Sequence, residues 1–163
     1  MIIIGAMSTE RIIGSGDGMP WDVPEEYAQF LRLIEGQTII IGRRSYEIFG
    51  EGLTSAHTVV VTRSAGKLPR AVAVTSVEDA LRTAESFGGT VFSAGGASIY
   101  AQTIALADTM YLSYIKGQFT GDAYFPAFSD QDWAVDRRED HPRFEFVVYR
   151  RIHHEDTKNT KDS

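Results

Sequence analysis

Residues 91–100 read Val-Phe-Ser-Ala-Gly-Gly-Ala-Ser-Ile-Tyr, which is an apolar run, two glycines and the start of a helical pattern. The run is typical of a strand, and the missing side chains of Gly95 and Gly96 let a pyrophosphate approach the amino terminus of the helix. The spacing differs from the Gly-x-Gly-x-x-Gly dinucleotide fingerprint, so a tight turn that needs a positive φ is an alternative explanation. The neighbouring segments decide between these two interpretations.

The order of strand, turn and helix recurs along most of the chain. Short β-branched runs predict strands at 2–4, 38–41, 59–61, 72–74, 90–92, 111–115 and 146–149, and helical patterns cover 24–34, 44–49, 76–86 and 97–105. This alternation predicts an α/β fold, a mostly parallel central sheet with helices on both faces. No helix is expected after Asp108, so strands near 108–115, 132–138 and 144–151 predict an antiparallel carboxy-terminal edge.

Length, charge and composition limit the classes of function. The 163 residues suit one domain, placed at 1–152, followed by a polar tail at 153–163 that we expect to be disordered. A net charge of −6 argues against nonspecific binding to nucleic acid. The absence of cysteine excludes disulfides, thiolate zinc sites and cysteine nucleophiles. No apolar run reaches the roughly 18 residues that span a bilayer, so we expect a cytoplasmic monomer that acts on a small molecule, without a membrane partner.

Histidines give little support to metal chemistry. His57 and His141 are isolated, and the run His153-His154-Glu155 lies in the polar tail. We therefore expect no metal site.

A glycine-rich segment at 14–26 precedes the first long helical pattern and reads Gly-Ser-Gly-Asp-Gly-Met-Pro-Trp-Asp-Val-Pro-Glu-Glu. A plain surface loop is one interpretation of such a segment. Met19 and Trp21, however, are large apolar groups that a merely connecting loop has little reason to carry. Their presence favours a lid over a binding site.

The helix that follows carries an acidic group on its apolar face. Glu26, Phe30 and Leu33 share that face at i, i+4 and i+7. Either the Glu26 carboxylate faces inward and pairs with an amidine-like donor pair of a substrate, or it only rims the face beside Glu25. Periodicity alone leaves both interpretations open.

Cations and hydroxyl groups follow two of the predicted strands. Gly42-Arg43-Arg44-Ser45-Tyr46-Glu47 begins where the strand at 38–41 ends, and Thr62-Arg63-Ser64 follows the strand at 59–61. Backbone N–H groups, hydroxyl groups and guanidinium groups would converge there as a phosphate cradle. Taken singly, each arginine is more simply a solvated surface charge.

Four motifs, taken in order, closely resemble the dihydrofolate reductase family. They are Met19-Pro20-Trp21 through Glu26, Gly42-Arg43-Arg44-Ser45-Tyr46-Glu47, Ala94-Gly95-Gly96-Ala97-Ser98-Ile99-Tyr100 and Gly121-Asp122-Ala123-Tyr124-Phe125-Pro126. The resemblance spans about residues 1–151 and implies a dihydrofolate reductase-like fold. It also implies the NADPH-dependent reduction of 7,8-dihydrofolate to 5,6,7,8-tetrahydrofolate, with hydride transfer to pterin C6.

The resemblance implies roles for individual residues. Glu26 would anchor the pterin, Ser113 would supply a hydroxyl group near it, and Trp21, Met19 and Tyr100 would complete the catalytic group. The substrate would contact Ile4, Gly5, Glu26, Tyr27, Phe30, Phe49, Leu53 and Ala94. NADPH, rather than NADH, would contact Ala6, Ile13, Gly14, Gly42, Arg43, Arg44, Ser45, Thr62, Arg63, Ser64, Gly95, Gly96, Ala97, Ser98 and Ile99.

The chain departs from the family pattern at several positions. Ala56, with His57 beside it, stands where the family has the arginine that binds the glutamate α-carboxylate of folate. Tyr46 replaces the usual Trp of the second motif, and Leu31, Arg32 and Ile34 depart from the usual sequence after Phe30.

These departures keep other functions open. One is an NADPH reductase of another pterin, or of a riboflavin-pathway aminopyrimidine, and the other is a noncatalytic nucleotide-binding module. The retained Glu26 speaks against the second of these.

Overall fold

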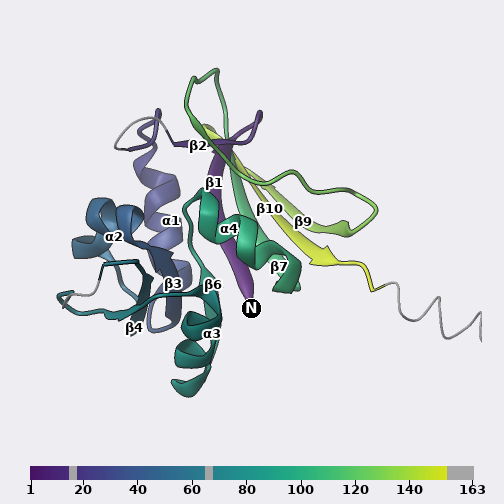
Figure 1. Cartoon of the computed structure of the whole chain (residues 1–163). Helices are drawn as coiled ribbons and strands as arrows, with labels where there is room; N and C mark the ends of the chain where they lie inside the picture. Colours follow the sequence, from purple (N-terminus) through teal and green to yellow (C-terminus); the bar gives the residue numbers. More distant parts are fainter. Residues whose placement is uncertain (15–17, 65–67, 154–163) are drawn as a thin grey trace, which may run out of the picture.

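A central eight-stranded sheet organises the computed structural model, which describes residues 1–14, 18–64 and 68–153 (Figure 1). The strand order is β5-β4-β3-β6-β1-β7-β10-β9. The strands are β1 (Ile2–Ser8), β3 (Thr38–Gly42), β4 (His57–Val61), β5 (Val72–Val74), β6 (Val91–Ser93), β7 (Thr109–Ile115), β9 (Trp133–Asp140) and β10 (Phe144–Arg151). Neighbours from β5 to β7 are parallel, whereas β10 pairs antiparallel with β7 and β9. The predicted α/β architecture with an antiparallel carboxy-terminal edge is confirmed.

The prediction was wrong about where the antiparallel edge begins. The strand expected near 108–115 was grouped with strands that lack helical crossovers, but β7 runs parallel to β1 from the Ile2–Thr109 pair to the Ser8–Ile115 pair. Helix α4 (Ala97–Thr103) and the 3-10 helix η2 (Ile104–Leu106) supply its crossover from β6. The antiparallel edge therefore consists of β10 and β9, added to β7.

Helices cover both faces of the sheet, as predicted. Alternate residues of β3 divide between the two faces: Ile39 and Ile41 pack on the side of α1 (Pro24–Ile34), and Ile40 packs on the side of α3 (Val77–Ser86) and α4. Figure 1 shows α3 and α4 on the near side of the sheet. Helix α3 begins one residue later than expected because Ser76 is its N-cap, accepting a hydrogen bond from the Asp79 N–H at 3.0 Å.

Three short elements were not predicted from the sequence. Strands β2 (Ile12–Gly14) and β8 (Ala123–Tyr124) form a separate two-stranded sheet, and η1 (Gly50–Gly52) extends α2 (Arg43–Phe49). The backbone N–H of Asp122 donates to the Gly14 carbonyl at 3.0 Å, and the Arg11 side chain donates to the Phe125 carbonyl at 2.5 Å. These contacts join the loop after β1 to a segment more than 100 residues away, which no local pattern reveals.

Parts of two predicted segments lie outside the described residues. They are Ser15, Gly16 and Asp17 of the glycine-rich segment, and residues 154–163 of the predicted tail. No helix among the described residues is long and apolar enough to cross a lipid bilayer.

Candidate functional site

Two adjoining hollows open where β1, β3 and β6 end. The inner pocket, about 100 Å³, and the outer cleft, about 580 Å³, share Ile13, Met19, Ser45, Phe49 and Gly96 in their walls. Strands β1 and β6 are neighbours in the sheet, and the chain leaves them on opposite faces, through α1 and α4. Ligands of open α/β sheets bind at such a point, beyond the carboxyl ends of the strands.

Glu26 lies in the wall of the inner pocket. It comes from the first turn of α1, is only 8% exposed, and makes a hydrogen bond with the Ser113 side chain of β7. Burial raises its pKa from 4.5 to about 6, although the Ser113 hydrogen bond acts in the opposite direction. The inward orientation is therefore the one that the structure adopts.

Aromatic rings form one side of the inner pocket. The Tyr27 ring lies 5.9 Å from both the Phe30 ring and the Phe49 ring, measured between centroids. The Tyr100 hydroxyl, which is buried, donates to the Ile4 carbonyl at 2.8 Å. Burial, together with the Glu26 carboxylate, raises the Tyr100 pKa, so its hydroxyl stays protonated. The inner pocket thus offers a flat apolar slot with one ionisable carboxyl group.

The outer cleft gathers the predicted cations. Arg43, Arg44 and Arg63 line it together with the hydroxyl groups of Ser45 and Thr62, among other residues. Arg43 also pairs with Glu47, one helical turn along α2, at 3.1 Å. Three guanidinium groups beside strand ends make this cleft suitable for phosphate groups, in a chain whose net charge is −6.

The two glycines of the turn bring backbone close to backbone. Gly95 adopts a φ of +93°, and a Cβ atom there would meet the Tyr100 ring at 2.8 Å. Its carbonyl accepts a hydrogen bond from the Gly42 N–H at 2.7 Å, which ties the β6–α4 turn to the β3–α2 junction. The positive φ that the alternative interpretation required is present, and Gly96 also lines both hollows.

Most of the predicted site residues lie in these walls, and five do not. The inner pocket contains Ile4, Gly5, Ala6, Ile13, Met19, Glu26, Tyr27, Phe30, Ser45, Phe49, Ala94, Gly96 and Tyr100. The outer cleft adds Gly14, Gly42, Arg43, Arg44, Thr62, Arg63, Ala97, Ser98 and Ile99. The five outside both walls are Trp21, Leu53, Ser64, Gly95 and Ser113.

Each of these five has a neighbouring role in the structure. Ser113 binds Glu26, and Gly95 binds Gly42, as described above. Trp21 packs edge-on against Phe119 at 5.5 Å, Leu53 packs against the same core cluster as Phe30, and the Ser64 N–H donates to the Thr62 hydroxyl group at 3.2 Å. They support the walls rather than form them.

Sequence reasoning missed several residues of the walls. Ile41 lines the inner pocket, and Thr75, Ser76, Gln102 and Asp122 line the outer cleft. Thr75 and Ser76 follow β5 just as Thr62 follows β4, so the rule that polar groups gather at strand ends could have found them. Ile41 stands in an apolar core run and gave no signal.

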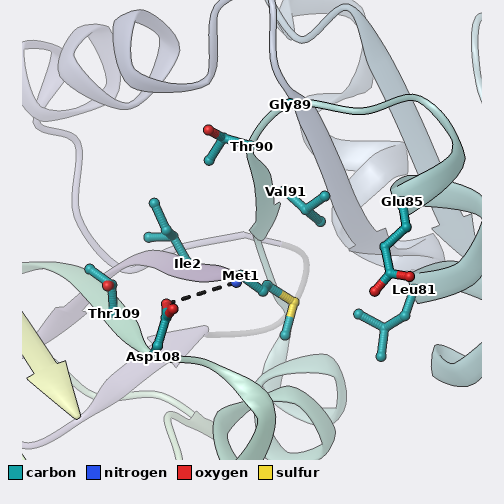
Figure 2. Close-up of a pocket in the computed structure, with 9 residues that line it drawn as sticks. All are labelled: Met1, Ile2, Leu81, Glu85, Gly89, Thr90, Val91, Asp108 and Thr109. Carbon is teal, nitrogen blue, oxygen red and sulfur yellow. Dashed lines mark ion pairs between the residues drawn. The ribbon is translucent and has the colours of Figure 1, made fainter.

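A separate hollow of about 460 Å³ lies at the other end of the strands, where β1, β6 and β7 begin (Figure 2). Its walls come from the start of β1, β6 and β7, and the Met1 amino group faces the Asp108 carboxylate there at 3.8 Å. None of the predicted site residues lines this hollow. It is larger than the inner pocket but contains neither a cation cluster nor a buried carboxyl group.

His57 and His141 each stack on an aromatic ring, and the His141 Nε2 also lies 3.7 Å from a Glu139 carboxylate oxygen. The His57 ring stacks on Phe87 at 4.0 Å, and the His141 ring stacks on Phe144 at 4.3 Å. Within residues 1–14, 18–64 and 68–153, no three metal-ligating side chains lie together. His154 and Glu155 fall outside these ranges.

Comparisons with known proteins agree on one family. A family model described as dihydrofolate reductase matches residues 1–152. The chain is 33% identical over 134 residues to dihydrofolate reductase type A13 of Escherichia coli, which covers 82% of this chain and 81% of that protein. It is 34% identical over 160 residues to dihydrofolate reductase HdrB of Haloferax volcanii, with 92% and 82% covered.

A solved structure supports the fold independently. Dihydrofolate reductase from Enterococcus faecalis, complexed with NADP(H) and RAB-propyl, superposes with a TM-score of 0.83 at 24% identity. The match covers 93% of this chain and 96% of that one. The arrangement of strands and helices around the two hollows is therefore shared with that protein.

Proposed function

The chain belongs to the dihydrofolate reductase family, and from this premise we propose that it reduces 7,8-dihydrofolate to 5,6,7,8-tetrahydrofolate with NADPH in the joined inner pocket and outer cleft. It is accordingly an oxidoreductase. The observation that carries the assignment to this site is the buried Glu26, whose carboxyl group lies in the wall of an aromatic slot. This inner pocket adjoins the outer cleft, which three guanidinium groups line.

Glu26 holds the pterin in this proposal. Its two carboxylate oxygens accept hydrogen bonds from the 2-amino group and N3 of the ring, a donor pair that replaces the water lost on burial. Ser113 fixes the orientation of the carboxylate from β7. The negative charge also favours the protonated form of the pterin, and N5 must gain a proton for the reduction to be completed.

The hydrogen-bond donors that line the outer cleft suit the phosphate groups of the cofactor. Arg43, Arg44 and Arg63 match the 2′-phosphate and diphosphate groups, and the close approach of Gly42 to Gly95 leaves a wall without side chains for the diphosphate. NADPH supplies, when bound, the hydride that adds to pterin C6. The walls that Ile13, Met19 and Phe49 share between the two hollows keep bulk water from the reacting rings.

We also propose that the protein works as a monomer in the cytoplasm, without a nucleic-acid partner. A cytoplasmic location would give the enzyme access to an NADPH pool, and the acidic net charge disfavours a nucleic-acid partner.

An assay of NADPH oxidation tests the proposed function. Dihydrofolate is compared with a dihydropterin that lacks the aminobenzoyl-glutamate tail, using purified protein. We expect oxidation with dihydrofolate at a kcat/KM above that for the dihydropterin, since the Tyr27, Phe30 and Phe49 rings offer contact area to the tail. No oxidation with dihydrofolate, or oxidation with the dihydropterin alone, would overturn the proposal.

A further inference from the structure

We propose that Arg143 is a positioning residue for Glu26, because it fastens the first turn of α1 to the strand pair that carries Ser113. The inference rests on the proposed function of Glu26 and extends it to a residue more than 100 positions away in the chain. Arg143 lies in the turn between β9 and β10, just before Phe144 begins β10. It lines neither the inner pocket nor the outer cleft.

Arg143 binds the segment before Glu26 at two points. Its Nη2 lies 2.6 Å from one carboxylate oxygen of Glu25 and 2.8 Å from the other, and its Nη1 donates to the Asp22 carbonyl at 3.4 Å. This hydrogen bond and charge hold the Glu25 pKa below its usual range. One guanidinium group thus spans the end of the glycine-rich segment and the first turn of α1.

The helix start has little else polar to hold it. Its N-cap residue, Val23, offers no side-chain hydrogen bond to the exposed N–H groups of the first turn. Val23 is held instead by apolar packing in one cluster with Ile115, Phe144 and Phe146. Apolar packing is not directional, so the rotation of this turn depends on the Arg143 contacts together with the Ser113 hydrogen bond of Glu26.

Ser113, the partner of Glu26, and Arg143, the partner of Glu25, belong to one frame formed by β7, β10 and the turn before β10. Ser113 of β7 is paired with Phe146 of β10, and the Lys116 N–H, just after β7, donates to the Arg143 carbonyl at 2.9 Å. Successive residues of one helical turn therefore bind this frame: Glu25 through Arg143, and Glu26 through Ser113. Loss of the first contact frees the turn to rotate and loosens the second.

The charges around Glu26 predict the direction of the effect. Tyr100 of α4 and Ser113 of β7 face it, and Glu25 precedes it in the chain with its charge balanced by Arg143. Removal of Arg143 leaves the Glu25 charge uncompensated and weakens the Ser113 hydrogen bond. Both changes disfavour the ionised form of Glu26, so its pKa should rise.

The test uses Arg143→Met, Glu25→Gln, their double variant and Arg143→Lys in the full chain. The matched control is Arg138→Met, which removes the 3.0 Å contact with Glu145 on the same hairpin without touching α1. Three measurements are made: the Glu26 pKa in the ligand-free protein by carboxyl carbon-13 NMR, the Kd for dihydrofolate without cofactor, and the melting temperature. An exposed ion pair contributes little to stability, so the melting temperature should barely move.

We expect Arg143→Met to raise the Glu26 pKa and to weaken the binding of dihydrofolate, with a Kd about 3- to 10-fold higher. This is the effect expected from the loss of one oriented charge contact. Glu25→Gln should weaken it similarly, the double variant should be no worse than either single variant, and Arg143→Lys should recover much of the loss. Arg138→Met should change nothing. An unchanged Glu26 pKa in Arg143→Met, or losses that simply add in the double variant, would overturn the inference. The NMR titration needs no substrate, so it tests the inference even if dihydrofolate proves not to bind.

Discussion

Glu26 combines a functional requirement with a cost to stability. Its folded-state pKa, about 6, lies above the ordinary value of 4.5, so its protonated form stabilises the fold below about pH 4.5 and this contribution is lost as the pH rises through 6. A shift of this size corresponds to about 2 kcal/mol at neutral pH and above. The carboxylate is retained where an uncharged group would be more stable.

Glu26→Gln should therefore raise the free energy of unfolding at about pH 8 by roughly 2 kcal/mol, and by almost nothing at about pH 4. The amide keeps a hydrogen-bonding group for Ser113 but removes the buried charge. Urea denaturation at the two pH values measures the difference. An equal change at both values would mean that ionisation of Glu26 does not govern the effect.

Ala56 is exposed and lies in a bend just before β4. Its N–H donates to the Gln37 carbonyl at 2.8 Å, at the start of the strand that carries Val60 on the α1 face. His57 points the other way, where it stacks on Phe87 of the chain segment that ends α3, so it does not replace the missing cation. The tail of dihydrofolate would then lack the arginine that the family supplies.

Ala56→Arg should tighten the binding of dihydrofolate by about 10- to 100-fold, because the new guanidinium group can form a bidentate pair with the tail carboxylate. A dihydropterin without the tail should gain nothing, because it carries no carboxylate for the new side chain. Binding titrations with the two ligands make the comparison. Equal gains for both ligands would refute a missing tail anchor.

At the scale of elements, the β3–α2 junction sets the cofactor preference. Arg43 and Arg44 both line the outer cleft, and Arg43 is already held by Glu47. Arg43→Ala and Arg44→Ala should each narrow the preference for NADPH over NADH, by about 1.5–3 kcal/mol where the 2′-phosphate contact is charge-assisted. The ratio of kcat/KM with the two cofactors measures this. Equal losses with NADPH and NADH would argue against a 2′-phosphate role.

The small β2–β8 sheet holds a wall of the site in place. A Cβ atom at Gly121 would overlap the Gly14 carbonyl and lie 2.6 Å from the Ile12 side chain, and Ile13 between them lines both hollows. Gly121→Ala should separate these strands and slow hydride transfer by about 10- to 100-fold, since small misplacements of reacting groups cost that much. Single-turnover kinetics test this, with Thr120→Ala, an exposed neighbour, as the control. A rate equal to that of the control would show that the small sheet does not position the wall.

For the molecule as a whole, local patterns predicted the elements, and long-range pairing supplied what they lacked. The β-branched run at 38–41 and the apolar face of 24–34 are visible in the local sequence. Strands and helices were therefore found with small errors at their ends. The β2–β8 sheet depends on contacts across the chain and has no such signal. The parallel pairing of β7 was missed because α4 was not recognised as its crossover.

Some residues of the site could likewise be predicted from the local sequence, and others could not. Strand ends with Arg43 and Arg63 could be read from the sequence, because charges stand out beside apolar runs. Whether Glu26 faced inward could not, since a slip of one residue in the helix turns the face away, and the Ser113 contact settles it. The Arg143 contact joins residues 118 positions apart and leaves no trace in local sequence.

In the proposed mechanism the Glu26 carboxylate holds the pterin and favours protonation of N5. Single-turnover hydride transfer from NADPH to dihydrofolate, followed between about pH 5 and pH 9 in the wild type and in Glu26→Gln, tests both roles. We expect the wild-type rate to fall as the pH rises, Glu26→Gln to be slower by about 10²-fold at neutral pH, and the pH profile of the variant to be displaced to lower pH. The same rate and the same pH profile in both proteins would contradict it.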